Sequence, residues 1–173
     1  MQSLKIILLC IASAIAYGIV HDQVTARVCV EYFTIGHPPV FNTESPTLLA
    51  IGWGIIATWW VGLMLGIPAA LAARVGRWPK LTAADLFRPI VYLLATMAGA
   101  SLLAGVAGYF AAKAGAVELV GSLALYVPAS KHLTFIADLW AHLAAYGVGF
   151  FGGLVVCGWI LVRRRRIAAV TKP

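Results

Sequence analysis

Residues 45–73 read SPTLLAIGWGIIATWWVGLMLGIPAALAA and contain no charged side chain. Two further runs, residues 89–112 and 139–162, also lack Asp, Glu, Lys and Arg. Each run exceeds the roughly 20 residues that cross about 30 Å of hydrocarbon. Because lipid offers the backbone no hydrogen-bond partner, each run must be helical. The sequence therefore predicts membrane spans over about 47–73, 89–112 and 135–162.

The composition supports a membrane domain along the whole chain. Apolar residues make up 62% of the 173 residues and charged residues 11%, with a mean hydropathy of +0.92. Soluble domains carry about 25% charged residues. These values exclude a disordered chain, a coiled coil and an ordinary water-soluble enzyme. We expect a single all-α integral membrane domain over residues 1–173, folded as a compact bundle of transmembrane helices.

The N-terminal segment has two interpretations. Residues 6–20 form an apolar stretch after Lys5, and Ala14-Ile15-Ala16 resembles the small-residue cleavage site of a signal peptide. In the other interpretation the stretch is a first transmembrane helix over about 4–22, extended as far as residue 33. The retained helix is our working prediction and gives a bundle of four helices, whereas cleavage would leave three.

The basic residues predict the orientation of the bundle. Ten of the 13 Lys and Arg residues fall on one side of it: Lys5, Arg74, Arg77, Lys80, Arg88, Arg163, Arg164, Arg165, Arg166 and Lys172. The positive-inside rule places this side in the cytoplasm. We therefore expect an N-in/C-in topology, with the C-terminus cytoplasmic, in an integral protein of a bacterial inner membrane.

The same basic residues account for the formal net charge of +7. The excess positive charge lies at the cytoplasmic helix ends, where it meets anionic lipid head groups. We therefore expect the lipid bilayer as a partner and do not expect nucleic acid. Small-residue seams in the spans would also suit a helix of another membrane protein or of a second copy of the chain.

The other polar residues are distributed asymmetrically along the chain. All four histidines and five of the six acidic residues fall on the outer side or at its boundary: His21, His37, His132, His142, Asp22, Glu31, Glu44, Glu118 and Asp138. The sixth acid, Asp85, is on the cytoplasmic side. The inner half of every predicted span contains neither type. This asymmetry predicts a polar cluster close to the extracytoplasmic surface.

Helix geometry predicts that polar residues of the first and last spans lie at a similar depth. At about 1.5 Å per helical residue, His21 lies about 24 Å above Lys5. On the same scale, His142 lies about 31 Å above Arg163. Both side chains therefore fall in the outer leaflet or just above it, where they can meet.

The last span also carries a pattern that predicts the direction of its polar side chains. Asp138 and His142 are four residues apart, and Gly149 and Gly153 follow on the same helical face. A Gly-x-x-x-Gly pair is a close-packing seam of membrane helices. We therefore expect Asp138 and His142 to point into the bundle rather than toward lipid.

Imidazole and carboxylate groups together suit Zn²⁺, Fe²⁺ or Mn²⁺. A catalytic zinc site needs three protein ligands and an open position, and a non-haem iron site needs two histidines and one carboxylate. The candidate metal ligands are His21, Asp22, Glu31, His37, Asp138 and His142. The sequence contains no His-Glu-x-x-His motif that would select two of these residues as a pair of zinc ligands. We expect a protein that binds a divalent transition metal and consider a metalloenzyme, although no motif identifies a reaction or a substrate.

Other interpretations of the same residues stay open. The polar residues can simply form hydrogen bonds between helices at the membrane boundary, with Glu31 paired to Arg27 one helical turn away. Asp and His chains also relay protons, as in an ion pathway or a transporter subunit. The chain can serve as a structural or assembly subunit of a larger complex. A b-type haem between His21 and His142 is the least favoured alternative.

Overall fold

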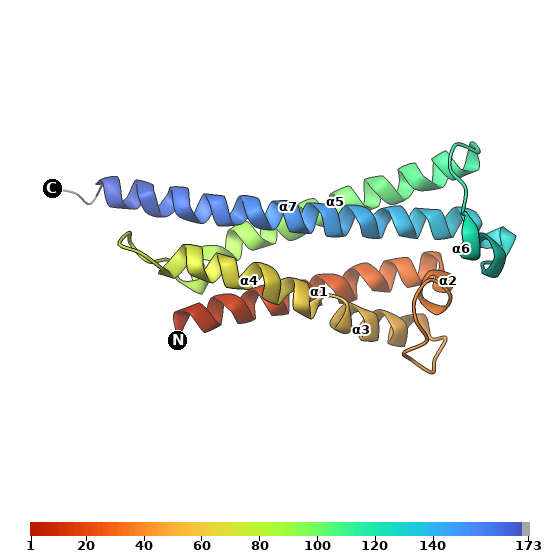
Figure 1. The fold of residues 1–173 in the computed structure, drawn as a ribbon, viewed down its shortest axis with the longest axis horizontal. Coiled ribbons are helices and arrows are strands. Elements are labelled where there is room, and N and C mark those ends of the chain that lie inside the picture. Colours follow the sequence, from red (N-terminus) through yellow and green to blue (C-terminus); the bar gives the residue numbers. More distant parts are fainter. Residues whose placement is uncertain (171–173) are drawn as a thin grey trace.

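The computed structural model describes residues 1–170, and it is helical throughout, with short connecting loops. Four helical stretches are long and apolar enough to cross a membrane: Gln2–Val28, Pro46–Arg74, Ala83–Lys113 and Ala129–Val170. The described helices are α1 (Gln2–Val28), α2 (Val30–Thr34), α3 (Pro46–Ile56), α4 (Trp59–Arg74), α5 (Ala83–Lys113), α6 (Gly121–Tyr126), the 3₁₀ turn η1 (Ala129–Lys131) and α7 (His132–Val170). The expected bundle of four membrane helices is confirmed (Figure 1).

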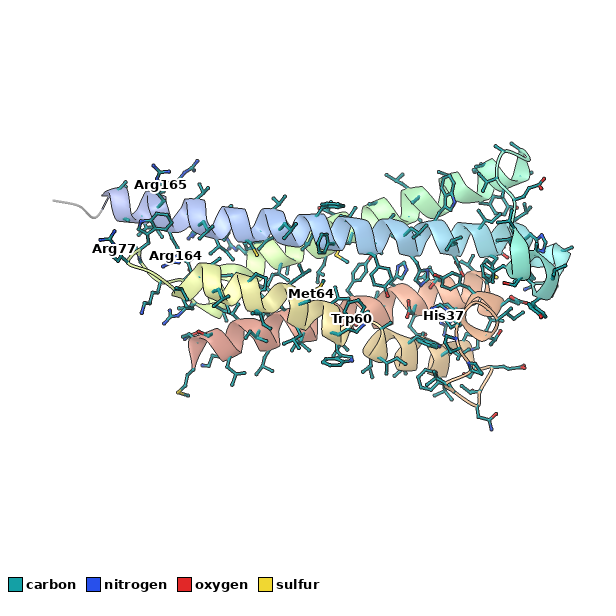
Figure 2. All side chains as sticks on the ribbon, viewed as in Figure 1. His37, Trp60, Met64, Arg77, Arg164 and Arg165 are labelled. Atoms are coloured by element: carbon teal, nitrogen blue, oxygen red, sulfur yellow. The ribbon has the colours of Figure 1, made fainter. Side chains whose placement is uncertain are left out.

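The helices pack as two pairs that lie against each other. α1 packs along α3 and α4, while α5 packs along α7, and α4 and α1 join the two pairs (Figure 1). The N-terminus and the end of α7 lie at one end of the bundle, and α2 and α6 lie at the other (Figure 1). Arg77, Arg164 and Arg165 are at the end with the termini, and His37 is toward the opposite end (Figure 2). Lys172, which contributed to the orientation argument, lies outside the described residues.

α1 ends earlier than its longest predicted extent, because Cys29 leaves the helical conformation with φ −151° and ψ 94°. The chain then turns into the short helix α2. This break overturns the expected pairing of Arg27 with Glu31, which required one continuous helix. Glu31 instead lies 3.3 Å from the ammonium of Lys131.

The second span is also interrupted, between α3 and α4 at Ala57–Thr58. The Thr58 hydroxyl donates a hydrogen bond to the carbonyl oxygen of Gly54 at 2.5 Å. Such back-bonding by threonine bends helices. Pro68, the residue usually associated with a kink, lies inside the continuous helix α4. α3, which carries Trp53, lies at the end of the bundle that carries α2 (Figure 1).

Glycines allow α1 to approach the second span closely. A Cβ atom added at Gly18 would lie 2.8 Å from the carbonyl oxygen of Gly54, and one added at Gly54 would lie 2.5 Å from the backbone nitrogen of Ile19. A Cβ atom added at Gly62 would likewise lie 2.7 Å from the Cα atom of Ile11. Only glycine fits at these backbone-to-backbone contacts. These contacts hold α1 against the second span up to about one turn before His21 and Asp22.

A fully buried arginine joins α7 to the end of α4. Arg164 is 1% exposed, and its guanidinium donates to the carbonyl oxygens of Pro79 at 2.8 Å, Val75 at 2.9 Å, Trp78 at 3.0 Å and Ala72. The Ala72 carbonyl is in the last turn of α4 and the other three follow that helix, so they have few helical partners of their own. The positive charge also lies at the negative end of the α4 dipole. Arg164 of α7 therefore caps the C-terminal end of α4.

Candidate metal site

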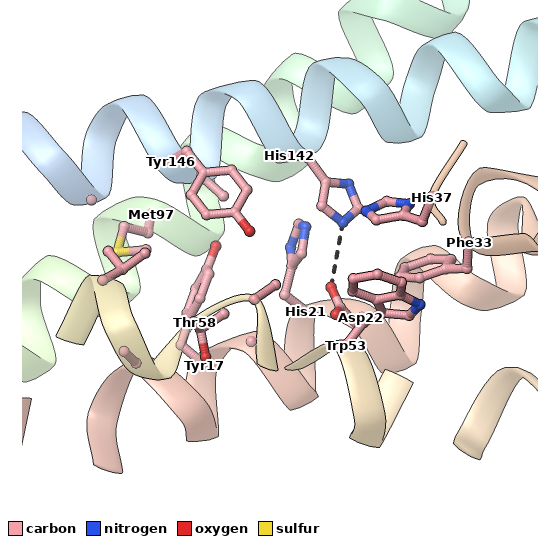
Figure 3. A pocket seen from close by; sticks show the side chains of 16 residues that line it. Tyr17, His21, Asp22, Phe33, His37, Trp53, Thr58, Met97, His142 and Tyr146 are labelled. Atoms are coloured by element: carbon pink, nitrogen blue, oxygen red, sulfur yellow. Dashed lines mark ion pairs between the residues drawn. The ribbon is translucent and has the colours of Figure 1, made fainter. Parts of the chain in front are cut away.

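Three side chains from the first and last spans form a buried cluster. His21 and Asp22 come from α1 and His142 from α7, and one donor atom from each lies within 4.8 Å of the others. Asp22 and His142 are 6% and 7% exposed, and His21 is half-buried. The rings of His21 and His142 are 4.5 Å apart between centroids and nearly perpendicular (Figure 3). The predicted meeting of the two spans is confirmed.

The hydrogen bonds of His142 define which of its ring nitrogens carries the proton. Nδ1 lies 2.7 Å from the backbone carbonyl oxygen of Asp138, which can only accept. Nδ1 is therefore the donor, and Nε2 of the neutral ring carries a lone pair. That atom lies 3.3 Å from Oδ1 of Asp22 (Figure 3). A lone pair and a carboxylate oxygen thus face each other and need a cation between them, either a proton or a metal ion.

The same argument applies to His21 through a serine of α5. The Ser101 hydroxyl donates its one proton to the carbonyl oxygen of Ala141 at 3.0 Å. Its oxygen lies 3.3 Å from Nδ1 of His21, so Nδ1 is the donor in that contact. Nε2 of His21 is left with a lone pair, and it is buried without a hydrogen-bond partner among residues 1–170. A buried acceptor without a partner is uncommon in folded proteins.

With both rings neutral and Asp22 ionised, the three groups offer one another only acceptor atoms. A tetrahedral ion with bonds of about 2.0–2.1 Å holds neighbouring ligand atoms about 3.4 Å apart. The separation of 3.3 Å between His142 and Asp22 is close to that spacing, and all three donor atoms lie within 4.8 Å of one another. It is longer than the roughly 2.7–2.9 Å of a charge-assisted hydrogen bond. Histidines that bind metals also donate their other ring nitrogen to a carbonyl or a similar acceptor, as both histidines do here.

The other three predicted ligands lie outside this group of donor atoms. Asp138 is 2% exposed and points into the bundle as expected, and its Oδ2 is buried without a partner. Glu31 forms its ion pair with Lys131 and accepts a weak hydrogen bond from the Cys29 thiol. Burial raises the pKa of Glu31, but the hydrogen bonds from its own backbone and from Lys131 outweigh it and hold that pKa below its usual value.

His37 lies beside the group rather than in it. Its Nδ1 is 2.8 Å from the carbonyl oxygen of Tyr32, so Nδ1 donates and Nε2 carries the lone pair. Its ring contacts Trp53, with 4.5 Å between centroids. Burial lowers the pKa of His37, which favours the neutral ring. His37 lines the same pocket as His21 and His142 (Figure 3).

An aromatic pocket of about 70 Å³ adjoins the three donor groups. Besides the cluster and His37, its lining includes Tyr17, Phe33, Trp53, Met97 and Tyr146. Tyr32 stacks on His142 with 4.4 Å between ring centroids. A water molecule needs about 10–15 Å³ of such space, so the pocket can hold several waters or a small ligand. We name it the site pocket.

Three residues of the site had not been singled out from the sequence. Ser101 orients His21, while Met97 and Tyr146 line the site pocket. Ser101 is one of only two Ser or Thr residues in the run 89–112, so a buried hydroxyl in an apolar span was a usable signal. Trp53 and Tyr17 also line the site pocket.

Comparisons of the chain with protein-family models, with curated proteins and with solved structures give no match.

Proposed function

We propose that this membrane protein binds a divalent transition metal, Zn²⁺, Fe²⁺ or Mn²⁺, through His21, Asp22 and His142. The observation that carries the proposal is the proton arrangement of the cluster. Both histidines use Nδ1 as a donor to fixed acceptors, so Nε2 of each and the Asp22 carboxylate are left as acceptors in a buried space. Two imidazoles and one carboxylate are the ligand set of many catalytic zinc and non-haem iron sites.

The surroundings of the cluster suit a reactive site better than a purely structural one. Three protein ligands leave at least one coordination position open, and the site pocket provides space beside them. A bound Zn²⁺ would supply a water of lowered pKa, and Fe²⁺ would supply redox chemistry. Phe33 and Trp53, both buried, line the side of the pocket that faces the outer loops. We therefore propose a metalloenzyme whose site lies in the extracytoplasmic half of the membrane.

A b-type haem fits this geometry poorly. Axial bonds of about 2 Å on opposite sides of an iron would hold the two ring centroids roughly 6 Å apart. The rings of His21 and His142 are 4.5 Å apart and nearly perpendicular. Asp22 also occupies the space beside Nε2 of His142.

A continuous proton pathway has little support beyond the cluster. No Asp, Glu, His, Lys or Arg lies between Lys5 and His21, or between His142 and Arg163. A path through this half of the membrane would therefore depend on water in apolar space. A metal site needs no such continuation.

Elemental analysis of the purified full-length protein tests the proposal. We expect about one metal ion per chain after mild purification, and less than about 0.2 for His142→Ala, because two ligands hold an ion poorly. His132→Ala is the matched control, since His132 bonds the carbonyl oxygen of Val127 and lies outside the cluster. Its metal content should equal that of the wild type. Less than about 0.2 metal per wild-type chain, or a content unaffected by His142→Ala, would overturn the proposal.

A further inference from the structure

A second cavity continues from the site pocket toward the end of the bundle that carries the termini. It measures about 80 Å³ and shares Ala14, Val61, Met97 and Gly149 with the site pocket. Its remaining walls are almost entirely apolar and come from α1, α4, α5 and α7, including Leu65, Ile90, Leu94 and Val156. We name it the deep cavity. In Figure 3 Met97 marks the side of the site pocket from which it continues.

Two tyrosines stand between the donor groups and the deep cavity. Tyr17 is one turn before His21 on α1, and Tyr146 is one turn after His142 on α7, so both lie on the side of the termini. Both project into the site pocket (Figure 3). The Tyr17 hydroxyl is buried beside Ser101 but, among residues 1–170, has no partner at hydrogen-bonding distance. A buried hydroxyl normally has one, so this group is available to a bound ligand.

One wall of the site pocket is formed by a residue that is also exposed on the outside of the bundle. Tyr146 lines the pocket and is nevertheless 44% exposed on a membrane-spanning helix. Exposure at this position is exposure to the bilayer. A membrane-dissolved molecule can therefore approach the site beside Tyr146 without crossing the outer loops.

From this arrangement we infer that the site accepts an oxygen-bearing amphiphile. The inference rests on the proposed function, because the metal ion would bind the head-group oxygen. The Tyr17 hydroxyl donates a hydrogen bond to the same head group, and the hydrocarbon part lies in the deep cavity. The deep cavity, at about 80 Å³, is about half the size of a cavity that holds benzene. The hydrocarbon part that fits is thus a short alkyl chain.

Hydroxamates of two lengths test this inference on the Co²⁺-loaded protein. Acetohydroxamate and hexanohydroxamate carry the same metal-binding head, and they differ by four methylenes. Each buried methylene strengthens binding about fourfold. We expect hexanohydroxamate to bind at least about tenfold more tightly, measured through the visible absorption of Co²⁺. Tyr17→Phe should weaken both ligands by a similar factor of about three to ten, because both carry the head group.

Ser13→Leu separates the deep cavity from unspecific partition of the longer ligand into detergent. Ser13 lines the deep cavity, whereas its neighbour Ala12 is exposed on the outside of the bundle. Ser13→Leu should remove the advantage of hexanohydroxamate and leave acetohydroxamate unchanged, while Ala12→Leu should change neither. An equal advantage in the wild type and in Ser13→Leu would overturn the inference. Failure of the wild type to bind Co²⁺ would instead overturn the metal site on which it rests.

Discussion

Asp22→Asn is expected to abolish stoichiometric metal binding and to leave the metal-free protein at least as stable as the wild type. The introduced amide is the same size as the carboxylate, and its NH₂ group can donate to the lone pair on Nε2 of His142. The substitution thus replaces two facing acceptors, 3.3 Å apart, by a donor and an acceptor. It also removes a buried charge, whose desolvation is costly. The metal, in contrast, loses its one anionic ligand.

The expected loss of metal affinity is at least about 100-fold, since removing even an outer-shell partner of a metal ligand costs 10–100-fold. Competition with a chelator of known affinity measures it, and thermal unfolding without metal measures stability. Asp85→Asn is the control. The Asp85 carboxylate accepts hydrogen bonds from the backbone and hydroxyl of Thr82, both at 2.8 Å, in the first turn of α5 at the far end of the bundle. This variant should lose about 1 kcal/mol of stability and no metal. Unchanged metal affinity in Asp22→Asn would contradict our account of the cluster.

Arg164→Met is expected to lower the free energy of unfolding by about 3–4 kcal/mol, because it leaves several buried carbonyl oxygens without a donor. The wild-type guanidinium satisfies four of them and is itself 1% exposed. Methionine fills a similar volume, so the effect reports the lost hydrogen bonds rather than a cavity. Arg164→Lys should give an intermediate loss, since an ammonium cannot reproduce the planar fork.

The neighbouring arginine provides the control for charge. Arg165 is exposed, and Arg165→Met removes the same charge from the same helix end. Its effect should stay within about 0.5 kcal/mol. Denaturant unfolding in one detergent compares the variants, and metal content per folded molecule should be equal in all of them. Similar losses for Arg164→Met and Arg165→Met would show that Arg164 acts only through its charge.

The features of the fold that depend on patterns over many residues, such as charge-free runs and glycine spacing, could be predicted from the sequence. The absence of charge over residues 45–73 and 89–112 is enough to specify helices in a membrane. The direction of Asp138 and His142 followed from Gly149 and Gly153, because a small-residue seam must face a neighbouring helix. The meeting of His21 with His142 followed from counting residues to the basic anchors.

The parts that depend on a single backbone angle could not be predicted. The break at Cys29 redirects Glu31 to Lys131, and no residue in that segment forbids a continuous helix. The break at Ala57–Thr58 coincides with a side-chain hydrogen bond from Thr58 to Gly54, and threonine occurs inside many continuous helices.

The composition of the donor group is also set by tertiary contacts. Nothing in the sequence was a reason to prefer any three of the six candidate ligands. Only side-chain packing brings His21, Asp22 and His142 together. Ser101 orients His21 from another helix, at a separation of 80 residues, and no local pattern connects them. Arg164 is likewise indistinguishable in sequence from the three exposed arginines beside it. Whether the three residues bind a metal stays a prediction.

X-ray absorption at the zinc edge of the Zn²⁺-loaded protein tests the central claim most directly. We predict a first shell of light atoms at about 2.0–2.1 Å, with the outer-shell scattering of two imidazole rings. Asp22→Asn and His142→Ala should each change or remove this spectrum. A sulfur neighbour at about 2.3 Å, as from Cys29, or a shell of oxygens without imidazole scattering, would contradict the account.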